Sequence, residues 1–353
     1  MGAEAVAMGV FLACLSALNS QIAGAEAPKC NGVREGKEEV YVRSMNHPSP
    51  DVTTVAPAGA AMLGRRRHYG EFYGLAPLPE SFGVVLGNCQ AESLRLVMDT
   101  PQRRFIRVPP VHEMTEEDAR RLHELAPAAH TVVTQPVRDD YHDLPLGTRQ
   151  VTAATSARVL TVPPVRFAGL HPFQAAIRVP GVEEEPPVVA YHDIRTLAVA
   201  AGIPVSSSIS PEAVRAIGRS SIDILRTREA TADVRVSDLF DTVTADHART
   251  VNHPGNAVWL PLGARVLDAL GDTDGHVDPG RPLLDAVRAP LAPEVVEAWD
   301  LPDEPRAEWL VEGEALDDAE VREAHTAWYA AHPEFVAAAV DRLAPLLAVW
   351  RAA

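Results

Sequence analysis

The nine residues FGVVLGNCQ, at positions 82–90, set the architecture of this chain. The apolar run 82–86 is typical of a strand that is buried on both faces of a parallel sheet. A tight glycine-asparagine turn at 87–88 follows, and apolar residues at helical spacing then predict a helix over 90–98. A buried strand that passes directly into a helix indicates an α/β layered fold.

The sequence downstream repeats this alternation of strands and helices. Thr115, with Asp118 three residues later, forms a capping box that predicts a helix running to residue 125. Pro211 marks the start of a long helix, and Gly271 marks the end of another. The expected strands cover 105–108, 131–134 and 159–162, and the long helices expected after residue 190 cover 211–228 and 256–270. We therefore predict a parallel sheet followed by a mostly helical region.

The composition is that of a globular protein and excludes a disordered chain. Of the 353 residues, 46% are hydrophobic and 23% are charged, which provides ample apolar surface for a core. The formal net charge of −16 argues against a broad basic surface for nucleic acid. From residue 291 to the C-terminus there are fourteen carboxylates and four arginines, which we interpret as the solvated face of a helical region.

The two ends of the chain differ from its middle. Residues 1–75 have no sustained periodicity and are rich in loop-forming residues, which predicts a flexible extension outside the fold; an ordered arm is the alternative. Residues 76–285 are expected to form the α/β catalytic core. Residues 286–353 are expected to form an acidic helical region packed on that core.

Targeting signals in the sequence are weak. The segment 5–18 is similar to the apolar part of a signal peptide, but the residues before it include Glu4 and no lysine or arginine. No stretch approaches the ~20 apolar residues of a membrane span. Three cysteines, Cys14, Cys30 and Cys89, do not make a disulfide framework. These features favour a cytoplasmic protein.

Cys89 is the first candidate for chemistry. It lies between the buried strand and the helix, where the positive end of the helix dipole favours the nucleophilic thiolate. Backbone N–H groups of the same turn are suited to stabilise an oxyanion, and parallel sheets bind ligands at the carboxyl ends of their strands. The alternative is a small buried cysteine in a tight turn.

His253 is the second candidate. It lies in Asn252-His253-Pro254-Gly255-Asn256, directly before the helix expected at 256–270. A cysteine nucleophile with a histidine base from a late loop is the arrangement that acyl-transfer chemistry requires. A single histidine in a loop, however, is more often structural or simply exposed.

These two blocks resemble the first and last blocks of the SGNH hydrolases, which are Gly-Asp-Ser and Asp-x-x-His. This chain has Cys89 in place of the serine and Thr250 where the aspartate falls, so it departs from an ordinary serine esterase. A narrower resemblance, over about residues 82–272, is to the WcbI-type polysaccharide biosynthesis acetyltransferases. It rests on VVLGNCQA at 84–91, QPVRDDY at 135–141 with LPLGT at 144–148, DVRVSD at 233–238, and Asn252-His253-Pro254.

The resemblance implies an SGNH-like three-layer fold, coenzyme A binding, and acetyl transfer to a sugar hydroxyl during surface polysaccharide assembly. It implies Cys89 and His253 as catalytic residues. The residues expected to bind coenzyme A are Asn88, Gln90, Gln135, Arg149 and Arg166, the arginines because guanidinium suits phosphate. The residues expected to bind the acceptor are Arg138, Asp139, Tyr141, His192, Asn252 and Asn256.

Several of these residues have a structural alternative. Most arginines in an arginine-rich chain lie on the surface. Asp139 and its neighbour Asp140 are suited to cap a helix, and Tyr191-His192-Asp193 fits a helix start as well as an acceptor site.

We therefore expect a coenzyme-A-dependent O-acyltransferase that moves an acetyl or similar acyl group to a sugar hydroxyl. Transfer through an acyl-Cys89 intermediate and direct transfer, with Cys89 only positioning the thioester, both fit these residues. The rivals are an SGNH-like cysteine thioesterase or esterase and a non-catalytic coenzyme-A-binding protein. The histidines lack metal-ligand spacing, so no metal site is expected.

Overall fold

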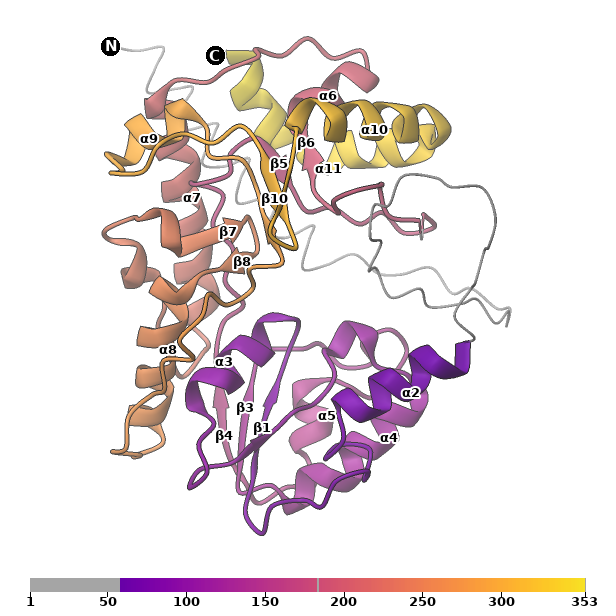
Figure 1. Ribbon diagram of the computed structural model, residues 1–353, viewed down its shortest axis with the longest axis vertical. Helices are drawn as coiled ribbons and strands as arrows, with labels where there is room; N and C mark the ends of the chain where they lie inside the picture. Colours follow the sequence, from indigo (N-terminus) through magenta and orange to yellow (C-terminus); the bar gives the residue numbers. More distant parts are fainter. Residues whose placement is uncertain (1–57, 183, 353) are drawn as a thin grey trace.

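The computed structural model describes residues 58–352, except residue 183. A four-stranded parallel sheet with strand order β2-β1-β3-β4 forms the lower part of the molecule in Figure 1. The strands are β1 Gly83–Leu86, β2 Phe105–Ile106, β3 Thr131–Thr134 and β4 Arg158–Thr161. β1 pairs with both β2 and β3, so the run that opens the fold lies inside the sheet.

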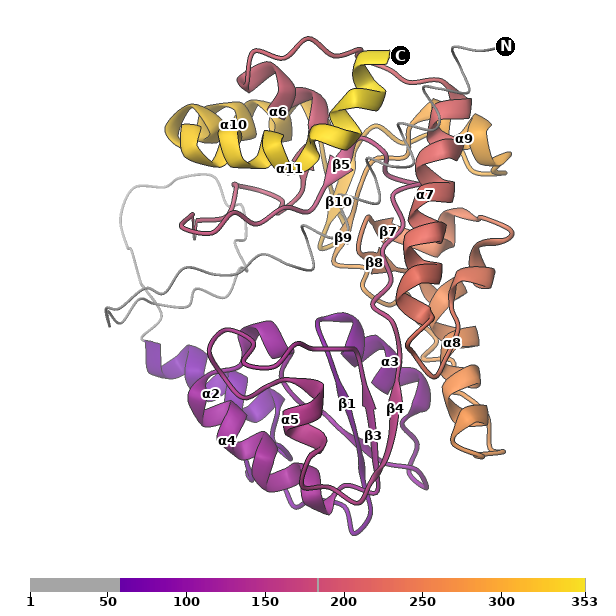
Figure 2. The same cartoon turned by 180° about the vertical axis from the view of Figure 1, so that it is seen from behind.

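Helices cover both faces of this sheet (Figure 2). Because side chains alternate along a strand, β1 serves two cores: Val85 packs in one apolar cluster, and Val84 and Leu86 pack in another. The first cluster includes α3 Gln90–Met98 and α8 Asn256–Ala269, and the second includes α4 Glu116–Leu125 and α5 Thr148–Thr152. The prediction of an α/β fold with a parallel sheet is confirmed.

Local sequence signals explain where the helices begin. Thr115 Oγ1 accepts the N–H of Asp118 at 3.3 Å, and Asp118 accepts the N–H of Thr115 at 2.9 Å, which is the predicted capping box of α4. Helix α7, Pro211–Glu229, starts at its predicted proline, and α8 ends one residue before its predicted end. β2 is shorter than the predicted strand 105–108.

A second, mostly helical part lies above the sheet in Figure 1. Its remaining helices are α6 Ile194–Ala200, α9 Pro293–Trp299, α10 Asp318–Ala331 and α11 Pro333–Ala352. Short antiparallel pairs connect them: β5 Gln174–Ala175 with β6 His192–Asp193, β7 Ala248–Thr250 with β8 His253–Pro254, and β10 Trp309–Val311 with both β9 Val287–Arg288 and β11 Glu314–Leu316. The 3-10 turns are η1 Val111–Glu113, η2 Ala126–Ala128, η3 Ser237–Phe240 and η4 Ala245–His247.

The helical part and the sheet share one core. α10 and α11 pack against α6, and Trp328 and Trp350 belong to the same apolar cluster as Val85 of the sheet. The expected boundary near residue 285 therefore does not separate two cores, and the division at that position stays a prediction.

The fold begins before residue 76, the boundary expected from the sequence. Helix α2, Ala58–His68, leads into Phe72, whose exposed fraction is 0%. Arg65 donates to Asp118 Oδ2 at 3.0 Å, and the Tyr73 hydroxyl donates to Asp118 Oδ1 at 2.6 Å. These contacts bind the segment to the start of α4. The rest of the expected extension, residues 1–57, lies outside the described residues.

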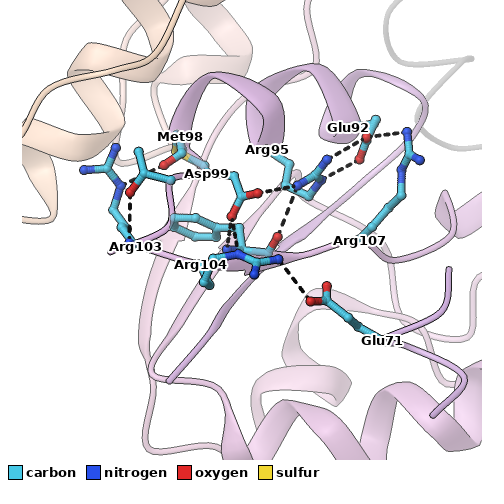
Figure 3. Close-up of polar contacts among 10 residues, drawn as sticks. Glu71, Glu92, Arg95, Met98, Asp99, Arg103, Arg104 and Arg107 are labelled. Carbon is cyan, nitrogen blue, oxygen red and sulfur yellow. Dashed lines mark hydrogen bonds and ion pairs between the residues drawn. The ribbon is translucent and has the colours of Figure 1, made fainter. Parts of the chain in front are cut away.

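An ion-pair network fixes α3 against β2 (Figure 3). Arg95 of α3 binds Glu92 at 2.8 Å and Asp99 at 3.1 Å, and it donates to the backbone oxygen of Phe105 at 3.3 Å. Arg107, which follows β2, pairs with Glu92 at 2.6 Å. The helix that carries Cys89 at its start is therefore held to the neighbouring strand. Nothing among the helices described here is long and apolar enough to cross a membrane.

Candidate active site

The turn after β1 is shaped by Gln135, the first residue after β3. Gln135 Oε1 accepts the N–H of Asn88 at 3.0 Å. A Cβ on Gly87 would lie 2.5 Å from the same oxygen, so glycine is required for this close approach. Asn88 Oδ1 accepts the N–H of Gln90 at 2.9 Å, which closes the turn. Cys89 is thereby fixed at the carboxyl edge of the sheet.

Gln90 connects this turn to two distant segments. Its Nε2 donates to the backbone oxygens of Val165, at 2.7 Å, and of Asn252, at 2.8 Å. Its Oε1 accepts from Val165 N at 3.0 Å and from Gln135 Nε2 at 3.1 Å. These bonds use the full capacity of the amide, and the side chain is 1% exposed. The expected role of Gln90 in binding coenzyme A is therefore corrected: it holds in place the loop that carries His253.

The structure brings the two expected catalytic residues together. Cys89 Sγ lies 3.7 Å from His253 Nε2, although 164 positions separate the residues in sequence. Cys89 is half-buried at the start of α3, and His253 begins β8. The contact is long for a hydrogen bond but ordinary for one that involves sulfur.

Both members of this pair are neutral near pH 7. Burial raises the pKa of Cys89, against the opposing effect of backbone N–H groups of the turn. Burial also lowers the pKa of His253 to about 4. The expected thiolate at the helix N-terminus is thus corrected, because desolvation of the charge outweighs the helix terminus here. The pair is a thiol and a neutral imidazole, which is suited to proton exchange.

Tyr191 and Thr250 complete the surroundings of His253. Tyr191 Oη lies 3.2 Å from Nδ1 and 3.4 Å from Nε2 of His253, and it accepts a hydrogen bond from Thr250 Oγ1 at 2.9 Å. In the described part of the chain, no carboxylate forms a hydrogen bond or ion pair with His253. The sequence reasoning did not select Tyr191 for this role, although it adjoins the expected site residue His192.

Arg166 lies near Cys89 and forms no ion pair within the part of the chain that the structure describes. Surrounding protein lowers the pKa of Arg166, and the charge interacts with both Cys89 and Tyr191, yet the side chain remains exposed. Arg228 lies near enough to Arg166 for the two positive charges to repel each other. Burial is the main cause that lowers the pKa of Arg228 to about 10, and the charge of Arg166 is the second. Neither arginine has an ion pair with a carboxylate among the described residues. Of the residues that the structure describes, Arg228 donates only to the backbone oxygen of Pro164, at 3.5 Å, so the two neighbouring guanidinium groups are chemically suited to bind an anion. Sequence reasoning missed Arg228, which lies at the end of α7, just before the DVRVSD motif and outside it.

The loop after β3 carries the remaining expected residues of that region. Arg149 is 84% exposed and forms an ion pair with Asp139, so its charge is already compensated. Arg138 is exposed, with its guanidinium 6.0 Å from the ring centre of Tyr141. Among the expected site residues of this loop, Gln135 is the one that hydrogen-bonds to the turn that carries Cys89.

Two expected acceptor-binding residues lie elsewhere. His192 is 1% exposed, and its Nδ1 lies 2.7 Å from the hydroxyl of Tyr329 in the core between α6, α10 and α11. The side chain of Asn256 binds the backbone of Arg281 and of Leu283 at 2.9 and 2.8 Å, which fixes a distant loop. Both expectations are therefore corrected. Asn252 does lie at the site, where its Oδ1 is 3.3 Å from the hydroxyl oxygen of Thr250.

The alternative of a helix-start cap holds for the neighbour of His192. Asp193 accepts the N–H of Thr196 at 2.9 Å and so caps α6. Within the described ranges, no group of three or more histidine, cysteine, aspartate or glutamate side chains is arranged to hold a metal ion.

The fold and this site define an α/β protein with a cysteine-histidine pair at the carboxyl edge of a parallel sheet. The family model of the polysaccharide biosynthesis enzyme WcbI matches residues 82–274, and the chain belongs to this family. The resemblance drawn from the sequence motifs is thereby confirmed.

A solved structure of WcbI has the same fold. It is described as the native protein without a disulfide bond between coenzyme A and one of its cysteines. The match covers 77% of this chain and 100% of that one, with a TM-score of 0.62 and 21% sequence identity. No curated protein matches the chain.

Proposed function

We propose that the protein transfers an acetyl or similar acyl group from coenzyme A to a hydroxyl of a sugar or polysaccharide precursor. The observation that carries this proposal is the contact of Cys89 Sγ with His253 Nε2 at 3.7 Å, beside the unpaired Arg166. A nucleophile, a base and an anion site at one sheet edge are the parts that a thioester with phosphate groups requires. Membership of a polysaccharide biosynthesis enzyme family supports the choice of a sugar acceptor.

In this proposal His253 acts as base in both halves of the reaction. His253 Nε2 takes the Cys89 proton as the sulfur attacks the carbonyl carbon of the thioester. The bond from that carbon to the coenzyme A sulfur breaks, and His253 returns the proton to the leaving sulfur. The acceptor hydroxyl then gives its proton to His253 while its oxygen attacks the acyl-Cys89. Finally, the Cys89 sulfur leaves and regains a proton, so the thiol is restored.

The other site residues receive roles from their contacts. We assign Arg166 and Arg228 to the phosphates of coenzyme A, with Asn88 and Gln135 next to the reacting carbonyl. We assign Asn252 and the loop residues Arg138, Asp139 and Tyr141 to the acceptor. We further propose that the sheet and its two helical layers are of the SGNH-like type. Residues 286–353 form an acidic helical region packed on the core, and the protein acts in the cytoplasm.

Intact-protein mass spectrometry tests the route. Wild-type protein mixed with acetyl-CoA should gain one acetyl group, and Cys89→Ala protein should gain none. No adduct on the wild type, together with full transferase activity of Cys89→Ala, would show that the acyl group moves directly to the acceptor. Release of coenzyme A at an equal rate with and without a sugar acceptor would instead indicate a thioesterase.

The two arginines that the sequence selected make a matched pair for coenzyme A binding. Arg166→Ala should weaken binding by about tenfold to 100-fold, the usual loss for a charged hydrogen bond. Arg149→Ala should change it by less than about twofold, because Asp139 already compensates that charge. Isothermal titration calorimetry measures both, and equal losses would refute the assignment of Arg166.

A further inference from the structure

Many catalytic histidines are oriented by a carboxylate, and in the described residues His253 contacts none. Its other polar neighbour is Tyr191, whose hydroxyl oxygen lies 3.2 Å from Nδ1 and 3.4 Å from Nε2. Thr250 donates to the same oxygen at 2.9 Å. Thr250 is also the cross-strand partner of His253 in the β7–β8 pair.

We infer that Tyr191 is the positioning residue of His253: its hydroxyl oxygen accepts the Nδ1 proton and so keeps the Nε2 lone pair directed at the Cys89 sulfur. The direction of this bond follows from hydrogen-bond accounting. In this arrangement the Cys89 thiol donates to Nε2, and the neutral imidazole carries its only proton on Nδ1, the ring nitrogen closer to Tyr191 Oη. The acceptor within reach of Nδ1 is Tyr191 Oη.

The surroundings hold Tyr191 rigidly enough for this role. The residue is 6% exposed, and its ring stacks on Trp309 with a centroid distance of 6.0 Å and an interplanar angle of 26°. Trp309 is itself fixed by a hydrogen bond from Nε1 to Asp318 at 2.9 Å. Thr250, which fixes the hydroxyl, is 0% exposed. The ring and the oxygen are thus each held by an independent contact.

A tyrosine differs from a carboxylate in one respect that matters here. Burial raises the pKa of Tyr191, so the hydroxyl stays neutral and provides a dipole instead of a negative charge. Such a group orients the imidazole without stabilising its protonated form strongly. This agrees with the lowered pKa of His253, which no negative partner counteracts.

Tyr191→Phe, which removes only the hydroxyl and keeps the ring on Trp309, tests the inference. The kinetic readout rests on the proposed acyl transfer: kcat should fall about tenfold, the factor for one neutral hydrogen bond, with KM for acetyl-CoA within about twofold. Nitrogen-15 NMR of histidine side chains provides a readout that needs no activity. His253 should be the Nδ1–H tautomer in the wild type and a mixture in Tyr191→Phe.

Tyr329→Phe is the matched control. Its hydroxyl also lies against a buried histidine, His192, at 2.7 Å, but far from Cys89 in the helical part. This variant should keep the kcat and the His253 tautomer of the wild type. Thr250→Ser, which retains a hydroxyl, should stay close to the wild type in both readouts, and Thr250→Val should shift both toward Tyr191→Phe.

Unchanged kcat and an unchanged tautomer in Tyr191→Phe would overturn the inference. An Nε2–H tautomer in the wild type would also overturn it, because Tyr191 would then be the donor. Absence of acyl transfer by the wild type would defeat the proposed function alone, since the NMR comparison would still decide the role of Tyr191.

Discussion

At the scale of single residues, the proposed acyl transfer depends on the protonation states of Cys89 and His253. Burial removes water from both side chains and so favours their neutral forms. In the proposed reaction the thiol loses its proton during the attack on the thioester, and the neutral imidazole accepts it. The two pKa shifts are complementary: one keeps a proton on Cys89, and the other keeps His253 able to accept it.

The raised pKa of Cys89 predicts a specific dependence of alkylation on pH. Only the thiolate reacts with iodoacetamide, and below the pKa its fraction rises about tenfold per pH unit. We expect the alkylation rate of Cys89 to rise in this way between pH 7 and pH 9. Peptide mapping by mass spectrometry separates Cys89 from the two other cysteines. A rate that is already constant at pH 7 would mean a preformed thiolate.

Loss of the base has a separate signature. His253→Ala should lower kcat by roughly 10²–10⁴-fold, the usual contribution of a general base, while coenzyme A affinity changes little. His332→Ala, a histidine substitution in the helical part, serves as the control. Weakened coenzyme A binding with near-normal kcat at saturation would make His253 a binding residue instead.

At the scale of elements, Gln90 connects three separate pieces of chain. The residue after β3, the segment after β4 and the loop before β8 all hydrogen-bond to its one buried amide. The position of His253 relative to Cys89 therefore depends on a residue that itself performs no chemistry.

Gln90→Leu has a similar size but leaves several buried polar groups without partners. Each such group costs about 1–3 kcal/mol, so we expect a loss of at least about 3 kcal/mol in the free energy of unfolding, together with reduced kcat. Urea denaturation measures the former. Gln102→Leu, at an exposed position, should be nearly neutral. Equal stability of the two variants would show that Gln90 is not a structural link.

Element positions follow well from the sequence, but the directions of side chains do not. The apolar run of β1, the capping box of α4 and the proline of α7 are local signals, and the structure has all three. The choice of His192 failed by one residue, because consecutive side chains in an extended segment point to opposite sides. Tyr191 faces His253, whereas His192 faces Tyr329. Which of the two side chains points toward His253 depends on packing between segments that are distant in sequence.

At the scale of the whole molecule, stability depends on pH through buried histidines. Burial lowers the pKa of His192 to about 3 and also lowers that of His325, whose ring centre is 5.9 Å away. As the pH falls below the unfolded value of about 6.5, the unfolded chain binds protons that the folded protein does not accept. The stabilising contribution is thus complete above pH 6.5 and is lost progressively below it.

His192→Phe tests this dependence. As the pH falls from 6.5 to 5, the variant should lose free energy of unfolding less steeply than the wild type. The two slopes should differ by up to about 1.4 kcal/mol per pH unit. Urea denaturation at three pH values in that interval gives both slopes. Parallel slopes would mean that His192 takes up its proton without unfolding.

The start of the fold is open to a matched truncation experiment. A chain that begins at Met62 retains Arg65, Phe72 and Tyr73, and we expect it to be as stable as the full chain. A chain that begins at Ala76 loses these contacts and should be less stable by about 3–5 kcal/mol, the usual cost of removing a buried phenylalanine. Thermal unfolding of the two proteins measures the difference. Equal stability would mean that the fold begins after Phe72.

The long separation between Cys89 and His253 has a consequence during synthesis. At translation rates of about 5–20 residues per second, the ribosome needs roughly 8–33 s to add the 164 positions between them. Throughout that interval the nascent chain carries Cys89 but lacks His253 and the backbone oxygen of Asn252 that Gln90 binds. Cys89 and His253 therefore meet only after most of the polypeptide has been made, and unfinished chains carry the Cys89 thiol without its histidine neighbour.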